Sequence, residues 1–97
     1  MGSNEPRIPS GAVTGRKTPV FNARTMPPAL GRDHIATVWA ELTVVRGSVQ
    51  FLEETGRSQT ATPGNPVTIT PNLKHHVVPN PNAEFYIQFY EVSDHWE

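Results

Sequence analysis

The chain has 97 residues, which is the size of one domain and too short for two hydrophobic cores. Eight basic and nine acidic residues give a formal charge of −1, which excludes a protein that binds nucleic acid mainly through a basic surface. Cysteine is absent, which excludes disulfides, thiolate nucleophiles and cysteine-ligated metal centres. No apolar run is long enough to cross a membrane, and residues 1–17 lack the apolar core of a signal peptide, so with cysteine also absent we expect a cytoplasmic protein.

The first part of the chain is predicted to be a flexible arm. Residues 1–16 are polar and rich in Gly, Ser and Pro, a composition typical of mobile termini. We expect one folded domain over residues 17–93 and a short C-terminal tail over residues 94–97. Tandem prolines at positions 27 and 28 argue against a helix over residues 26–31, because proline lacks a donor and restricts the residue before it.

The clearest strand signal lies in the middle of the chain. Residues 35–45 alternate, with Val38, Ala40, Leu42 and Val44 on one face, and Trp39, Glu41, Thr43 and Val45 on the other. Turn residues then separate shorter predicted strands at residues 49–52, 59–62, 67–69, 75–78 and 84–92. No segment has the periodicity of an amphipathic helix. The sequence therefore predicts an all-β fold, either a sandwich or a small barrel.

The tract from Thr62 to His75 resembles the second sequence motif of the cupins. In that motif Gly64 supplies a first turn and Asn72 occupies a glycine position in a second turn. Asn suits that place because it tolerates the left-handed backbone conformation better than other residues with a side chain. His75 falls on the position of a metal ligand in the cupin motif.

The first cupin motif ends at a glycine between two strands, and Gly47 fits that position. His34 lies thirteen residues earlier, at the place of the motif's first histidine. Ala36 and Ala40 occupy the places of two further ligands. Taken with the segments at residues 39–47 and 85–90, the pattern is similar to the tellurite-resistance-type small cupins, a domain also found fused to a tellurite methyltransferase. The resemblance covers about residues 17–91.

This resemblance implies a cupin-type double-stranded β-helix, that is, a small closed jelly-roll barrel. It also implies one divalent metal, Zn, Fe, Cu or Ni, held by His34 and His75, together with a small molecule in the barrel. Cupins commonly form dimers, and a core this small favours association, so we expect a homodimer.

Four further residues are candidates for an additional ligand or for the pocket wall. Successive side chains of a strand point to opposite faces, so His76 and His75 cannot both face the interior, and the resemblance favours His75. Glu41 is either a carboxylate ligand, if the register shifts, or a solvent-facing charge. Tyr86 and Gln88 share one face of a strand, which either lines the pocket or faces water.

Three functions are compatible with these residues. The first is a metal-binding cupin that serves in tellurite or stress response. The second is a metal-dependent enzyme, either an Fe(II) dioxygenase or a Zn-assisted lyase or isomerase acting on a small carbonyl compound. The third is a metal-free module that binds a small molecule or a partner. The sequence singles out no catalytic residue.

Overall fold

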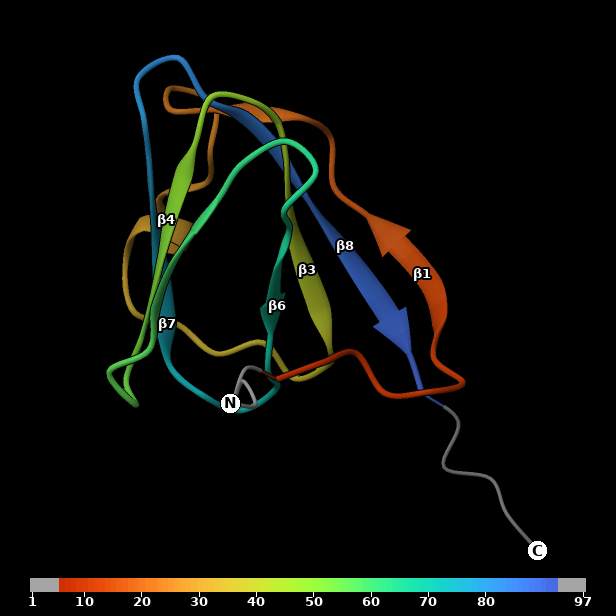
Figure 1. The fold of residues 1–97 in the computed structure, drawn as a ribbon. Coiled ribbons are helices and arrows are strands. Elements are labelled where there is room, and N and C mark those ends of the chain that lie inside the picture. The colour runs from red at the N-terminus through yellow and green to blue at the C-terminus, as the bar shows by residue number, and fades with distance from the viewer. Residues whose placement is uncertain (1–5, 93–97) are drawn as a thin grey trace, which may run out of the picture.

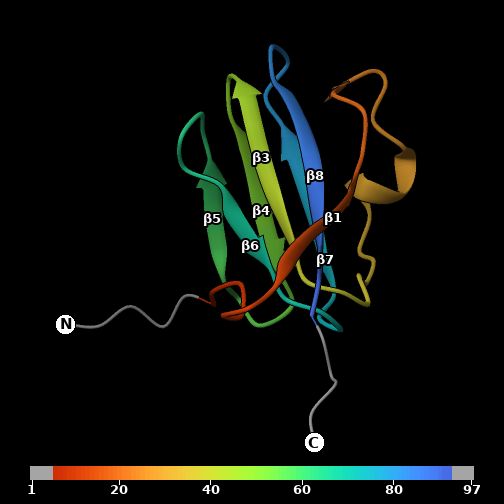
Figure 2. The ribbon, with the colours of Figure 1, turned by 90° about the vertical axis from the view of Figure 1, so that its right-hand side faces the viewer.

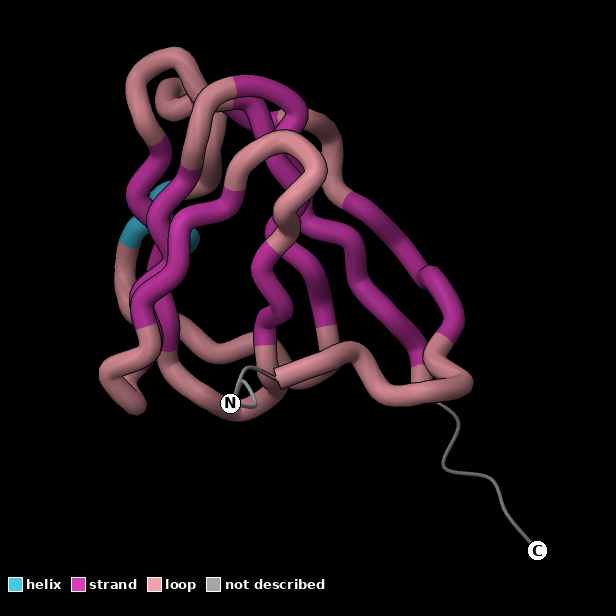
Figure 3. Tube along the Cα trace, viewed as in Figure 1, coloured by secondary structure: helices cyan, strands magenta, loops and turns pink. Residues whose placement is uncertain are grey.

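The computed structural model describes residues 6–92, which form two antiparallel β-sheets and almost no helix (Figures 1 and 3). The larger sheet has the strand order β1 (Val13–Lys17), β8 (Glu84–Glu91), β3 (Ala40–Arg46) and β6 (Val67–Ile69), with β2 (Phe21–Asn22) also pairing with β8. The smaller sheet has the order β5 (Ser58–Ala61), β4 (Val49–Glu53) and β7 (His75–Pro79). The all-β prediction is confirmed.

The prediction of a closed barrel is wrong. Figures 1 and 2 show the two sheets as separate layers that face each other, and none of the described strands pairs across from one sheet to the other. On one side β5 and β6 are joined by a turn that contains Pro63 and Pro66, which have no N–H to donate to a continuing ladder. The sheets are therefore held together by side-chain packing.

The core lies between the inner faces of the two sheets. Phe51, Phe85, Leu42 and Val49 are its largest fully buried side chains. In β3 the buried and half-buried residues alternate, as the period of two predicted. However, β3 begins at Ala40 and the predicted strand over residues 35–39 does not form, because that segment leaves the larger sheet and approaches β7 instead.

Two local predictions at the N-terminal end also differ from the structure. Strand β1 lies partly within the segment expected to be a flexible arm, and its backbone pairs with β8 although its side chains are mostly exposed. A ladder needs only backbone groups, so an exposed edge strand leaves little pattern in the sequence. Residues Pro28–Gly31 form one turn of 3-10 helix (η1), in which a proline at the first position has no hydrogen bond to lose.

The predicted C-terminal tail lies outside the described residues, as do residues 1–5. Within residues 6–92, no helix has the length and apolar character that a membrane crossing requires.

Candidate functional site

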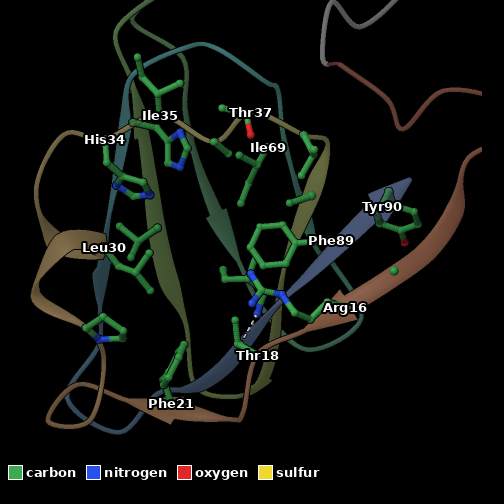
Figure 4. Close-up of a pocket in the computed structure, with 18 of the residues that line it drawn as sticks. Arg16, Thr18, Phe21, Leu30, His34, Ile35, Thr37, Ile69, Phe89 and Tyr90 are labelled. Carbon is green, nitrogen blue, oxygen red and sulfur yellow. Dashed lines mark hydrogen bonds between the residues drawn. The ribbon is translucent and has the colours of Figure 1, made fainter. Parts of the chain in front are cut away.

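A cavity of about 520 Å³ opens between the two sheets, within the size range of small-molecule sites (Figure 4). Its wall is mostly apolar, with side chains from both sheets and from the segment around η1. The apolar residues are Phe21, Pro27, Leu30, Ile35, Ala36, Val38, Ala40, Ile69, Val77, Ile87 and Phe89. The polar ones are Arg16, Thr18, His34, Thr37, His75, Tyr90 and Glu91.

His34 and His75 meet at the wall of this cavity. The backbone N–H of each residue donates to the carbonyl of the other, both at 2.9 Å. A third bond, from Asn72 N–H to the Ala36 carbonyl at 2.7 Å, ties the same loop to the turn before β7. That turn requires a positive φ of 67° at Asn72, which confirms the prediction for this residue. The two imidazole rings lie edge to face, with 4.4 Å between their centroids.

Each ring is oriented by a hydrogen bond to its own loop. His34 Nδ1 lies 2.9 Å from the Arg32 carbonyl, and His75 Nδ1 lies 3.1 Å from the Leu73 carbonyl. Because a carbonyl can only accept, each Nδ1 must carry the hydrogen, and in the neutral ring the lone pair is then on Nε2. Neither Nε2 has a hydrogen-bond partner among residues 6–92. The site therefore offers two imidazole acceptors to a ligand.

His75 is buried, with 2% of its surface exposed. Burial lowers the pKa of His75 below its usual value of 6.5, because the charged ring loses its hydration, and the bond to Leu73 and the carboxylate of Glu53 oppose this effect only in part. His75 is therefore neutral at pH 7, in the form that accepts a hydrogen bond or ligates a metal.

The histidine pair continues a row of polar residues across the smaller sheet. Glu53 of β4 pairs with His75 of β7 in the smaller sheet. The backbone N–H of Glu53 donates to the carbonyl of Arg57, the residue just before β5. The side chain of Glu53 is only 4% exposed, and its Oε1 lies 3.4 Å from Arg57 Nε. Arg57 also donates to the carbonyl of Thr68 in the opposite sheet. The ion pair between Glu53 and Arg57 thus lies beside His75, and the hydrogen bond from Arg57 to Thr68 links the two sheets.

Phe51 contacts both His75 and Arg57. Its ring stacks on His75 with 5.1 Å between centroids, while the guanidinium of Arg57 lies 4.9 Å from its centre. Glu53 and Arg57 were not predicted as site residues, because both lie in a polar stretch that is typical of an exposed turn. The available signal was the alternation of buried residues in β4, since Val49, Phe51 and Glu53 share one face.

The other predicted site residues lie on the outer faces of the sheets, away from the cavity. His76 Nδ1 lies 2.9 Å from Asp33 Oδ1. Glu41 accepts a hydrogen bond of 2.9 Å from the hydroxyl of Tyr90. Tyr86 lies beneath the ammonium group of Lys17, and Gln88 donates to the carbonyl of Gly15 at 3.1 Å. Tyr86 and Gln88 face outward because side chains alternate along β8 and Phe85 and Ile87 occupy its inner face.

Few side chains at this site could ligate a metal ion. Among residues 6–92 no group of three or more His, Asp or Glu side chains is close enough to hold one ion. His34 and His75 supply two nitrogens, while Ala36 and Ala40, at the places of two further cupin ligands, supply none.

Residues 16–87 match the family of TehB-like domains. The chain belongs to the TehB-like family. This is the tellurite-resistance-type family that the sequence resemblance indicated. No match to a curated protein was found.

Two solved structures share the fold of this TehB-like domain. A protein from Escherichia coli strain K12 superposes with a TM-score of 0.86 at 20% identity, over 94% of this chain and 92% of that chain. TehB from Haemophilus influenzae superposes with a TM-score of 0.73 at 23% identity, over 84% of this chain but only 32% of TehB. The domain thus spans about a third of the length of TehB.

Proposed function

We propose that this TehB-like domain is a small-molecule-binding module whose ligand lies in the cavity between the sheets. The ligand places a hydrogen-bond donor, such as a hydroxyl group, at the histidine pair, where it donates to the Nε2 of His75. The observation that carries the proposal is the pair of imidazole acceptors, each with its Nδ1 already bonded, at the wall of a mostly apolar cavity.

Two contributions would stabilise the bound ligand: burial of its apolar part and a hydrogen bond to a histidine acceptor. An apolar ligand body removes the cavity wall from water, which supplies most of the affinity. The donor group fixes the orientation, because a buried acceptor without a partner costs about 1–3 kcal/mol. Asn72 and the paired backbones of His34 and His75 hold both rings in place before the ligand arrives.

We further propose that the fold is a small, open relative of the cupin jelly roll, serving in a tellurite or stress response. The family match, the positive φ of Asn72 and the pairing of the two motif histidines support this proposal. The homodimer and the cytoplasmic location stay predictions from the sequence.

A second candidate is a divalent metal on the same two nitrogens. It is favoured by one specific observation: histidine ligands usually donate their other ring N–H to a carbonyl or carboxylate, as both rings do here. Two protein ligands would hold Zn, Fe, Cu or Ni weakly, with other positions left to water or the small molecule. Either enzymatic alternative, the dioxygenase or the lyase, depends on this metal.

The experiment is an NMR titration of the protein with hexan-1-ol as the probe, for wild type, His75→Phe and His76→Phe. We expect shifts in the cavity-lining residues and an affinity about fivefold lower in His75→Phe, which keeps a ring but loses the acceptor. His76→Phe, on the outer face, is the matched control and should bind like wild type. Equal affinity in wild type and His75→Phe, or shifts confined to the outer surface, would contradict the proposal.

Metal content, measured by elemental mass spectrometry after incubation with Fe(II), Zn, Cu and Ni, separates the two candidates. About one metal per chain in wild type and none in His75→Ala would favour the metal site. No metal in either protein leaves the metal-free module.

A further inference from the structure

Strand β1 contains a bulge that faces the cavity. Thr14 pairs with Tyr90 and Lys17 pairs with Gln88, so two residues of β1, Gly15 and Arg16, lie opposite the single residue between them on β8. That residue is Phe89. Such a bulge changes the face to which the following side chains point.

The bulge separates two neighbouring cations. The ammonium of Lys17 lies 5.0 Å from the ring centre of Tyr86, on the outer face of the larger sheet. The guanidinium of Arg16 instead lies 5.2 Å from the ring centre of Phe89, and Arg16 lines the cavity. Figure 4 shows the Arg16 side chain beside Phe89, on the opposite side of the cavity from His34.

Arg16 has no carboxylate partner within the described part of the chain. The ion pairs among residues 6–92 are Arg57 with Glu53 and His76 with Asp33. Glu91 also lines the cavity, and its carboxylate lies against the backbone of Gly15, because a Cβ at that position would lie 3.2 Å from both Cγ and Oε2 of Glu91. The cavity therefore has the guanidinium of Arg16 at one wall, where the Glu91 carboxylate also lies against the neighbouring Gly15, and two imidazole acceptors at the other wall.

We propose that the ligand of this cavity is a hydroxycarboxylic acid with an apolar chain. Its carboxylate pairs with Arg16, and its remote hydroxyl donates its one proton to the Nε2 of His75. The planar guanidinium matches a carboxylate through two parallel hydrogen bonds, and Phe89 supports it from one side. This inference rests on the proposed function and adds the carboxylate, which an alcohol-binding site would not select.

The test compares hexan-1-ol, hexanoate and ω-hydroxyhexanoate in NMR titrations at low salt. In wild type we expect ω-hydroxyhexanoate to bind most tightly. Arg16 is exposed, so Arg16→Met should weaken both acids by up to about fivefold, the upper end of the range for an exposed ion pair, and leave hexan-1-ol unchanged. Lys17→Met removes the same charge one residue away on the outer face, and we expect it to bind all three probes like wild type.

Two outcomes would overturn the inference, and only one of them would also contradict the proposed function. If hexan-1-ol binds at the cavity while the acids bind no better and Arg16→Met changes nothing, the carboxylate site is wrong and the proposed function survives. If none of the probes shifts the cavity-lining residues, both are wrong.

Discussion

At the scale of single residues, the candidate site depends on a buried histidine that stays neutral. The ring of His75 is held between His34 and Phe51, and its pKa is lowered chiefly by burial. Within residues 6–92, Glu53 is the carboxylate that raises the pKa of His75, while His34 and His76 lower it further.

This lowered pKa predicts how stability depends on pH. The unfolded chain protonates His75 near its ordinary pKa of 6.5, whereas the folded chain does so only at lower pH. Between these values the unfolded state binds more protons, so the free energy of unfolding falls as the pH drops below about 6.5. Urea denaturation at neutral and mildly acidic pH should show a larger loss in wild type than in His75→Phe. An equal loss in both proteins would contradict the burial argument.

The ion pair beside His75 allows a second prediction at this scale. Arg57→Met leaves the buried carboxylate of Glu53 without its cation, and we expect a loss of about 2–3 kcal/mol in the free energy of unfolding. Glu53→Gln keeps an acceptor for the Thr55 hydroxyl and should cost about 1 kcal/mol. The double variant removes the uncompensated charge, so its loss should be smaller than the sum of the two. A strictly additive double variant would show that the two groups do not interact.

The sequence revealed some of these residues better than others. His34 and His75 could be found because a motif spacing marks both, while alternation predicts only that His75 and His76 point to opposite faces and the resemblance favours His75. Glu53 is marked only by the alternation along β4, and that signal competes with the general rule that a charged residue beside a turn is exposed in most proteins. Arg16 could not be placed, since its direction depends on a bulge that only the pairing of β1 with β8 reveals.

At the scale of elements, the turn between β3 and β4 fixes how the two sheets are connected. Gly47 has a φ of 77°, and a Cβ at this position would lie 3.0 Å from the Cα of Ala83. Gly56, in the turn between β4 and β5, also has a positive φ of 95° but has no atom within 4 Å of the same point. Substitution of Gly56 would therefore introduce backbone strain alone, whereas substitution of Gly47 would add a steric overlap to that strain.

We therefore expect Gly47→Ala to lower the free energy of unfolding by about 2–3 kcal/mol. Gly56→Ala, which carries the strain of positive φ alone, should cost about 1 kcal/mol. Thermal or urea denaturation of both variants checks this, and equal losses would show that the contact with Ala83 has no effect.

Strands with one buried face were predictable, and elements that depend on distant partners were not. The alternation in β3 and β8 follows directly from burial on one side. The segment over residues 35–39 has strand composition but pairs with nothing in the larger sheet except through Trp39, whose carbonyl accepts from Tyr90 N–H. Intrinsic preference is weak against such tertiary context.

At the scale of the whole molecule, two open sheets enclose a cavity that a fully packed sandwich of this size would lack. The core contains two fully buried phenylalanines, Phe51 and Phe85, among smaller aliphatic side chains, and both histidines line the cavity that remains between the layers. This arrangement belongs to a TehB-like domain that forms about a third of the longer TehB and, in the Escherichia coli protein, nearly the entire chain.

The most direct test of ligand binding between the sheets is to measure intermolecular nuclear Overhauser effects between hexan-1-ol and the wild-type protein. Our account predicts contacts from the alcohol's methylene protons to the methyl groups of Leu30, Ile69 and Val77, which line the cavity from three different elements. It also predicts contacts from the carbon that bears the hydroxyl to the ring of His75. Contacts only to exposed residues such as Val45 and Val78, with none to the cavity wall, would contradict it.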